Sequence, residues 1–274
     1  FILNYKKKSE PCVLTFFVLI GTNYSRIFEK NSPMLADQFE QIIQRRRSNR
    51  RFDPEVIVAD EVIERSLKRA ILSPNSSNMQ LWEFYWIQSP AEKEKFHALC
   101  LGQSAAKNTS HLVVFVTRQD LWSQRAKWNL SRIKESLQGK EPGKMEKRGL
   151  QYYGQLMPLL YRQDPFGFFT GIRKAMCFVM GIRKPFMRFG GKADQRVSVH
   201  KSCGLAAQTF MLSIAAEGLE SCPMEGFDAV RVKKALNLPS GAEVNMIIAV
   251  GKATQEGIWG PRNRVPYNEV VFIR

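Results

Sequence analysis

The spacing of apolar residues predicts several helices after residue 33. Apolar residues at helical intervals, opening at Met34, predict a first helix that ends in a run of arginines. Residues 59–73 predict a second helix, with Asp60 able to cap its start. The apolar segment 203–222 predicts a long buried helix with Gly218 near its end as a left-handed cap, and Asp228 is placed to cap a shorter helix after it.

Three segments have the pattern of strands. Residues 81–88 are aromatic and alternate, residues 111–118 are apolar enough to be central in a sheet, and residues 243–251 form the third. The middle of the chain, about 119–200, instead alternates basic helical turns with aromatic residues. It contains Gly-Ile-Arg-Lys twice, at Gly171 and Gly181, and two copies are too few for a repeat architecture.

The chain is strongly basic, with a net charge of +16 over 274 residues. Much of the excess lies in residues 119–201, which hold 17 Lys or Arg against 6 Asp or Glu. A basic balance fits nucleic acid, an anionic membrane or a phosphorylated ligand, and does not choose among them.

The cysteines and histidines predict structural roles. No pair among the five cysteines has Cys-x-x-Cys spacing, and only three histidines are present, so we expect reduced thiols in a cytoplasmic protein and no metal site. We expect His111 and His200 to be satisfied structural histidines, and Cys203 and Cys222 to pack in the core.

The first 33 residues differ from the rest of the chain. Basic residues precede a short apolar run, as in a signal peptide, but no convincing small-residue cleavage site follows, and the run is short for a membrane span. We expect residues 1–33 to be an extension outside the fold. Residues 34–274 are then a single domain with a basic, aromatic-rich insert at about 119–200.

Four separate segments carry a recognisable combination of motifs. They are Arg-Arg-Ser-Asn-Arg at 46–50, Ser-Pro-Asn-Ser-Ser-Asn-Met-Gln-Leu-Trp at 73–82, Cys-Pro-Met-Glu-Gly-Phe-Asp at 222–228 after the long helix, and Pro-Arg-Asn-Arg-Val-Pro at 261–266. In order and spacing they resemble the FMN-dependent nitroreductase family, from about Met34 to the end of the chain apart from the insert. Asn75 stands where that family usually has Ser, and Leu81 where it has Pro.

The resemblance implies a fold and an activity. The fold would be α+β, with a central antiparallel sheet flanked by helices, in a domain-sharing homodimer with two FMN sites at the interface. The enzyme would pass a hydride from NADH or NADPH through flavin N5 to an electron-poor acceptor, such as a nitroaromatic or a quinone, by a ping-pong mechanism. No Gly-x-Gly-x-x-Gly motif offers a separate nicotinamide nucleotide site.

The resemblance also assigns residues to the cofactor. Guanidinium groups bind phosphate bidentately, so Arg46 would hold the FMN phosphate together with Arg262 and Arg264. Arg50 would lie by the pyrimidine edge of the ring and favour its reduced form. The predicted cofactor-binding residues are Arg46, Arg47, Ser48, Arg50, Pro74, Asn75, Ser76, Gln103, Pro223, Met224, Glu225, Gly226, Arg262 and Arg264. We expect Arg45 and Arg51 to be solvated charges.

The remaining assignments concern two loops. Pro74, Asn75 and Ser76 would reach the flavin of the other subunit, while Asn78 orders their loop and Trp82 lies in the core. No side chain is assigned as a certain catalytic acid or base; the backbone N–H of Glu225 or Gly226 would donate to flavin N5. Gln103 would hydrogen-bond the ring, with Lys107 as a second option, and Ser202 is a further polar contact.

Other functions remain open at this stage. A reductive dehalogenase-like or flavin-consuming relative of the same fold would carry similar motifs. A protein of another class, which binds a membrane or nucleic acid with a vestigial flavin site, would also explain the arginines, although no nucleic-acid-binding motif accompanies them. The insert is open to three interpretations: a lid, a subdomain, or a peripheral membrane-contact surface.

Overall fold

The computed structural model describes residues 28–163, 166–188 and 190–274. The chain divides into two units, 1–41 and 42–274, and helix α1 (Phe28–Arg45) runs across the boundary. The helix predicted to open at Met34 therefore begins at Phe28. The extension expected at 1–33 lies outside the described residues as far as residue 27, so its separation from the fold stays a prediction.

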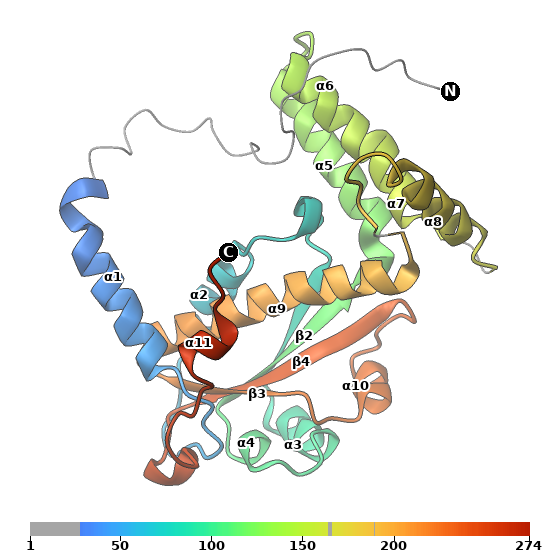
Figure 1. Ribbon diagram of the computed structural model, residues 1–274. Coiled ribbons are helices and arrows are strands. Elements are labelled where there is room, and N and C mark those ends of the chain that lie inside the picture. The colour runs from blue at the N-terminus through green and yellow to red at the C-terminus, as the bar shows by residue number, and fades with distance from the viewer. Residues whose placement is uncertain (1–27, 164–165, 189) are drawn as a thin grey trace. The chain divides into compact units, whose positions relative to one another are not determined.

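Four antiparallel strands form the sheet of the second unit, in the order β1, β2, β4, β3 (Figure 1). The strands are β1 (Trp82–Ile87), β2 (His111–Arg118), β3 (Glu220–Met224) and β4 (Ala242–Gly251). All three predicted strands are confirmed, and β2 is central and almost wholly buried as predicted. Strand β3, which pairs with β4, was not predicted.

Helices cover both faces of the sheet (Figure 1). Leu112, Val114 and Val116 of β2 face a core shared with α3 (Pro90–Leu99), α4 (Ser104–Lys107) and α10 (Ala229–Ala235). Val113 and Phe115 face the opposite core, shared with α2 (Asp60–Ala70) and α9 (Lys192–Ala216). Side chains alternate across a strand, so a wholly apolar strand serves two cores. The predicted α+β class with a helix-flanked antiparallel sheet is confirmed.

Of three predictions about helix ends, some were wrong and some were confirmed. Helix α9 begins at Lys192 and ends at Ala216, so the predicted span 203–222 was wrong at both ends, although Gly218 does have the left-handed φ of +80°. The prediction that Asp60 caps α2 was wrong, because the N-cap is Ala59 and Asp60 is the first helical residue. Asp228 caps α10 as predicted, accepting a 3.0 Å hydrogen bond from the Arg231 amide.

The insert is helical, and its buried residues share a core with residues outside it. It contains α5 (Trp122–Leu137), α6 (Lys144–Gln151), a π-helical turn (Tyr152–Leu156), α7 (Met157–Tyr161) and α8 (Phe168–Met180), and it ends before α9, earlier than expected. Its core joins Ala126, Met157 and Tyr161 to Met79 and Leu81, which follow the Ser-Pro motif. The insert is therefore packed against one of the predicted cofactor loops.

Four short elements complete the second unit. They are the 3₁₀ turns at Ser76–Asn78, Gln119–Leu121 and Gln255–Gly257, and α11 (Tyr267–Val270). Of the helices in the described ranges, none combines the length and the apolar character that crossing a bilayer requires.

Candidate functional site

The first motif runs as an extended segment beside β3. Ser48 forms a parallel bridge with Ser221, and the Asn49 amide donates to the Ser221 carbonyl at 3.1 Å. The Arg50 amide donates to the carbonyl of Gly257, in the turn after β4, at 2.8 Å. The backbone between Ser48 and Arg50 is thus fixed between β3 and that turn, which joins the first motif to the third.

Asn49 is the buried centre of this segment. Its side chain is fully buried, and its Oδ1 accepts a 3.0 Å hydrogen bond from the Arg51 amide. A Cβ atom at Gly257 would overlap the Asn49 side chain, so only glycine fits there without movement. Asn49 Nδ2 and Ser221 Oγ are both buried and have no hydrogen-bond partner within the described part of the chain.

Four of the predicted arginines come together from the two ends of the fold. Arg262 Nη2 donates to the carbonyls of Ile43, Gln44 and Arg46 at 2.7–3.1 Å, so the tail binds the end of α1. Burial, and then the charges of Arg262, Arg264 and Arg47, lower the pKa of Arg46.

These four arginines, 46, 47, 262 and 264, are called the arginine cluster below. Across residues 28–163, 166–188 and 190–274, no carboxylate forms an ion pair with any of the four. The only hydrogen bonds that they donate to described residues go to backbone carbonyls, including one from Arg47 to Gly260 at 2.7 Å.

Arg50 lies over an aromatic ring. Its guanidinium carbon lies 4.5 Å from the centre of the Trp259 ring. Burial raises the pKa of the Cys222 thiol, while the charges of Arg50 and Arg46 lower it, so both arginines act on the middle of β3. Trp259 was not predicted; its place just before the Pro-Arg-Asn-Arg tail is a signal that could have found it.

The third motif lies at the end of a strand. Cys222, Pro223 and Met224 belong to β3, and Glu225 and Gly226 form an exposed turn after it. The prediction that this motif lies at the end of the long helix was wrong, because α9 ends at Ala216. Gln103 Nε2 donates to the Gly226 carbonyl at 2.5 Å and to the Cys100 carbonyl at 3.0 Å. Gln103 therefore fastens the turn to the start of α4.

The Ser-Pro loop is held on α9. The Ser76 amide donates to Ser202 Oγ at 3.1 Å, and Asn75 Oδ1 accepts from the Gln80 amide at 2.8 Å. Asn78 orders the loop as predicted, through hydrogen bonds with Asn129 of α5. Within the described residues, no hydrogen bond joins this loop to the arginine cluster or to the Glu225–Gly226 turn. The expectation that the loop serves a second chain's cofactor stays a prediction.

Two arginines outside the predicted set differ from expectation. Arg45 forms an ion pair with Glu220 at 2.9 Å and donates to the Gly218 carbonyl, and Arg51 forms an ion pair with Glu256. The interpretation of both as plain solvated charge was wrong. Their carboxylate partners distinguish them from the cluster.

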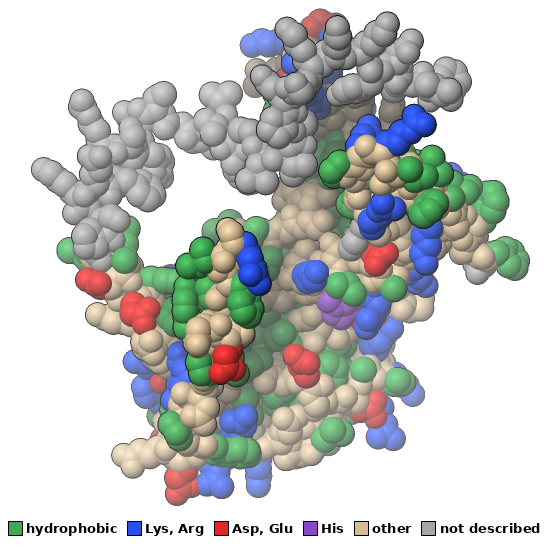
Figure 2. All heavy atoms as spheres, viewed as in Figure 1, with side chains coloured by type: hydrophobic (Ala, Val, Ile, Leu, Met, Phe, Trp, Pro, Cys, Tyr) green, Lys and Arg blue, Asp and Glu red, His purple; other side chains and the backbone are tan. Residues whose placement is uncertain are grey.

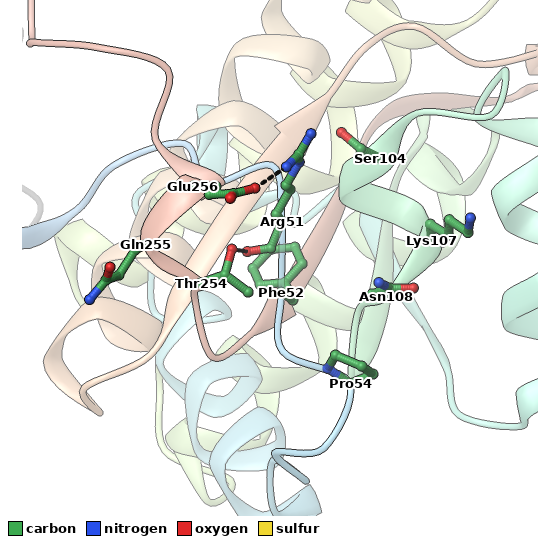
Figure 3. A pocket seen from close by; sticks show the side chains of 9 residues that line it. All are labelled: Arg51, Phe52, Pro54, Ser104, Lys107, Asn108, Thr254, Gln255 and Glu256. Carbon is green, nitrogen blue, oxygen red and sulfur yellow. Dashed lines mark hydrogen bonds and ion pairs between the residues drawn. The ribbon is translucent and has the colours of Figure 1, made fainter.

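A pocket of about 540 Å³ lies next to the predicted site (Figure 3). It is lined by Arg51, Phe52, Pro54, Ser104, Lys107, Asn108, Thr254, Gln255 and Glu256, and of these Lys107 was named as a second option for contact with the flavin ring. Because Glu256 already pairs with Arg51 there, the arginine cluster is the better match for a phosphate dianion.

The buried thiols and histidines have the structural roles predicted. Burial raises the pKa of Cys203 to about 12 and that of Cys100 to about 11, so both stay protonated at neutral pH. His111 accepts from Trp86 Nε1 at 3.1 Å and donates to the Val58 carbonyl at 2.8 Å. His200 is paired with Glu243 and Asn245.

The fold and these motifs define an α+β protein with a cluster of arginines beside one edge of an antiparallel sheet. The model of the nitroreductase family matches residues 43–252, most of the chain, and the chain belongs to that family. As a member of the nitroreductase family, the chain is an oxidoreductase.

Individual relatives are distant but cover nearly the whole fold. Protein DrgA of Synechocystis is 27% identical over 84% of this chain and 90% of its own length. A Thermus thermophilus protein named NADH dehydrogenase is 28% identical over 84% of this chain and 93% of its own. A crystal structure from Exiguobacterium sibiricum, in complex with FMN, is 21% identical, covers 86% of this chain and 97% of its own, and superposes with a TM-score of 0.63.

Proposed function

We propose that this chain is an FMN-dependent oxidoreductase that takes electrons from NADH or NADPH and delivers them to a flat, electron-poor acceptor such as a nitroaromatic or a quinone. When bound, FMN supplies the capacity to accept a hydride from one substrate and to reduce a second. The residues of the chain bind the cofactor, orient it and adjust its charge environment.

The arginine cluster is the observation that carries the proposal. Like charges repel, and the lowered pKa of Arg46 reflects that repulsion together with burial. An arrangement that lacks a carboxylate partner is stabilised by an external anion, and a phosphate dianion accepts from several guanidinium groups at once. The donor set therefore fits the phosphate of FMN.

The neighbouring residues fit the other end of such a cofactor. Arg50, held over Trp259, provides a positive charge that would favour a reduced, anionic ring. Gly226 and Glu225 are exposed after β3, where their backbone N–H groups can face a ligand. Gln103 holds that turn in place through the Gly226 carbonyl.

The comparisons support both cofactors. The FMN in the Exiguobacterium structure and the NADH in the name of the Thermus protein belong to those proteins, and we extend them to this chain because the family and the motifs are shared. We also propose that two chains form a homodimer in which Pro74, Asn75 and Ser76 approach the partner's cofactor. Four buried, reduced cysteines support a cytoplasmic location.

Removal of the cluster tests the proposal directly. Arg46→Ala and Arg264→Ala should each weaken FMN binding about tenfold or more, the effect of losing one charge-assisted hydrogen bond. Arg51→Ala is the matched control, since Arg51 pairs with Glu256 outside the cluster and should retain FMN. Fluorescence titration of the apoprotein measures each Kd. Full flavin retention in both cluster variants would refute the phosphate assignment.

A further inference from the structure

We propose that the outer face of α8, with the segment that follows it, docks on an anionic membrane surface. This docking face consists of Ile172, Phe178, Val179, Ile182 and Met187 together with the basic residues Lys174, Arg183, Lys184 and Arg188. The inference goes beyond the proposed redox function and does not depend on it.

The apolar residues of α8 are turned outward. Ile172 and Val179 lie two helical turns apart in α8 and are 44% and 63% exposed, and Ile182, just after the helix, is 65% exposed. Phe178 beside them is 64% exposed. A helix of a globular domain normally packs its apolar stripe against the core of the domain. In α8 these apolar residues instead lie on the side that faces away from the core.

The rotation of α8 is fixed by a buried arginine. Arg173 is 1% exposed, and its guanidinium donates to the carbonyls of Gly190, Leu159 and Arg162 and to Thr170 Oγ1. Burying a guanidinium is costly unless it is hydrogen-bonded, and these hydrogen bonds offset the cost for Arg173. Because Arg173 and Cys177 occupy the inner side, the apolar residues remain on the outer side.

The charge around the apolar residues has one sign. The segment from Phe166 to Arg188 contains five Lys or Arg and no Asp or Glu. Apart from the buried Arg173, its basic residues are exposed, and hydrophobic and basic side chains lie intermixed on this part of the surface (Figure 2). The next acid after the segment, Asp194, accepts from the Gly191 amide at the start of α9.

Exposed apolar residues among basic residues favour an anionic bilayer over the other two candidate partners, which are a second copy of the chain and a nucleic acid. Exposed apolar side chains enter the boundary between headgroups and acyl chains, while Lys and Arg contact anionic headgroups. In a two-fold contact at this place, the face would meet the same face of a second copy, and its exposed Lys and Arg would repel one another. A nucleic acid would satisfy the charges but leave the aliphatic side chains in water.

Flotation of the full-length protein with lipid vesicles tests the proposal. We expect binding to vesicles of phosphatidylcholine with about 30% phosphatidylglycerol and little binding to pure phosphatidylcholine. Arg183→Gln with Lys184→Gln should lower the partition coefficient about fivefold for each charge removed. Ile172→Asp with Val179→Asp should abolish binding, and Val230→Asp, at a more exposed apolar position on α10, should not change it.

Three results would overturn the proposal. One is the absence of flotation of the wild-type protein at low salt. Another is flotation that both pairs of substitutions leave unchanged. The third is a shift of oligomeric state, by sedimentation, in the Ile172→Asp/Val179→Asp variant without any vesicle binding by the wild type, which would make the face a contact between copies. Since the glutamine pair alters only exposed side chains, it keeps the test valid if the aspartate pair misfolds.

Discussion

The hydroxyl of Ser77 lies 2.6 Å from the hydroxyl of Tyr152, although 75 residues separate them in the sequence. The Tyr153 hydroxyl donates to the Ser77 carbonyl at 3.0 Å, and Ser77 has a left-handed φ of 55°. Tyr152 opens the π-helical turn of the insert, and such turns frequently lie at functional sites. The insert therefore holds the Ser-Pro loop in a conformation that its own sequence would rarely adopt.

Loss of this connection should loosen the Ser-Pro loop. Tyr152→Phe and Tyr153→Phe each remove one hydrogen bond, worth about 0.5–1.5 kcal/mol, so FMN binding to the assembled protein should weaken about two- to tenfold. Tyr85→Phe is the control, because the Tyr85 hydroxyl donates to Glu83 on β1. Equal FMN affinity in all three variants would show that these hydrogen bonds from the insert do not support FMN binding.

A methyl group at Gly257 should disturb the Ser48–Arg50 segment. Gly257→Ala places a Cβ atom within the Asn49 side chain, and we expect a loss of about 1–3 kcal/mol in the free energy of unfolding. Urea denaturation measures the change. Gly171→Ala, in α8 with open space around it, should instead stabilise by up to about 1 kcal/mol. An unchanged free energy of unfolding in Gly257→Ala would show that the Asn49 side chain can move aside.

The protein should lose stability in acid through Glu217. Hydrogen bonds from Arg65, and then from Arg69, lower the pKa of Glu217 to about 2 from its ordinary 4.5, against a desolvation effect that raises it. A carboxylate with a lowered folded-state pKa stabilises the fold above pH 4.5, and this contribution disappears as the pH falls from 4.5 toward 2.

Glu217→Gln isolates that contribution. At pH 7 the variant should be less stable by about 1 kcal/mol, a value discounted for solvent screening, and the difference should vanish near pH 2. Urea midpoints of both proteins across this range are the measurement. Glu64→Gln serves as control, since its partner Lys68 lies on the same exposed helix turn. A difference between wild type and Glu217→Gln that is independent of pH would contradict the ion-pair account.

Much of the sheet could be predicted because its strands have strong local patterns. Residues 112–116 are apolar without interruption, and the structure places their strand in the sheet interior. Strand β3, with the sequence Glu-Ser-Cys-Pro-Met, is short and has no alternation, and its pairing with β4 determines its conformation. The polar first turns of α9 were missed for a similar reason, since a partly buried helix with polar residues lacks the periodicity of a surface helix.

At the site, contacts between residues that lie far apart in the sequence could not be predicted. Arg45 and Arg51 read as ordinary charges, because Glu220 and Glu256 lie 175 and 205 residues away. The arginine cluster could be anticipated only through the resemblance of the motifs, which links residues 46–50 to 262–264. The connection between Ser77 and Tyr152 had no local signal, since it depends on how the insert packs.

We propose that the arginine cluster and the Glu225–Gly226 turn after β3 form a working FMN site. The most direct measurement is the visible absorption spectrum of the purified protein, before and after NADPH is added without oxygen. We expect a yellow protein whose flavin bands bleach on reduction. A colourless protein that takes up no added FMN would contradict the proposal, and the arginines would then need an explanation from another anionic partner.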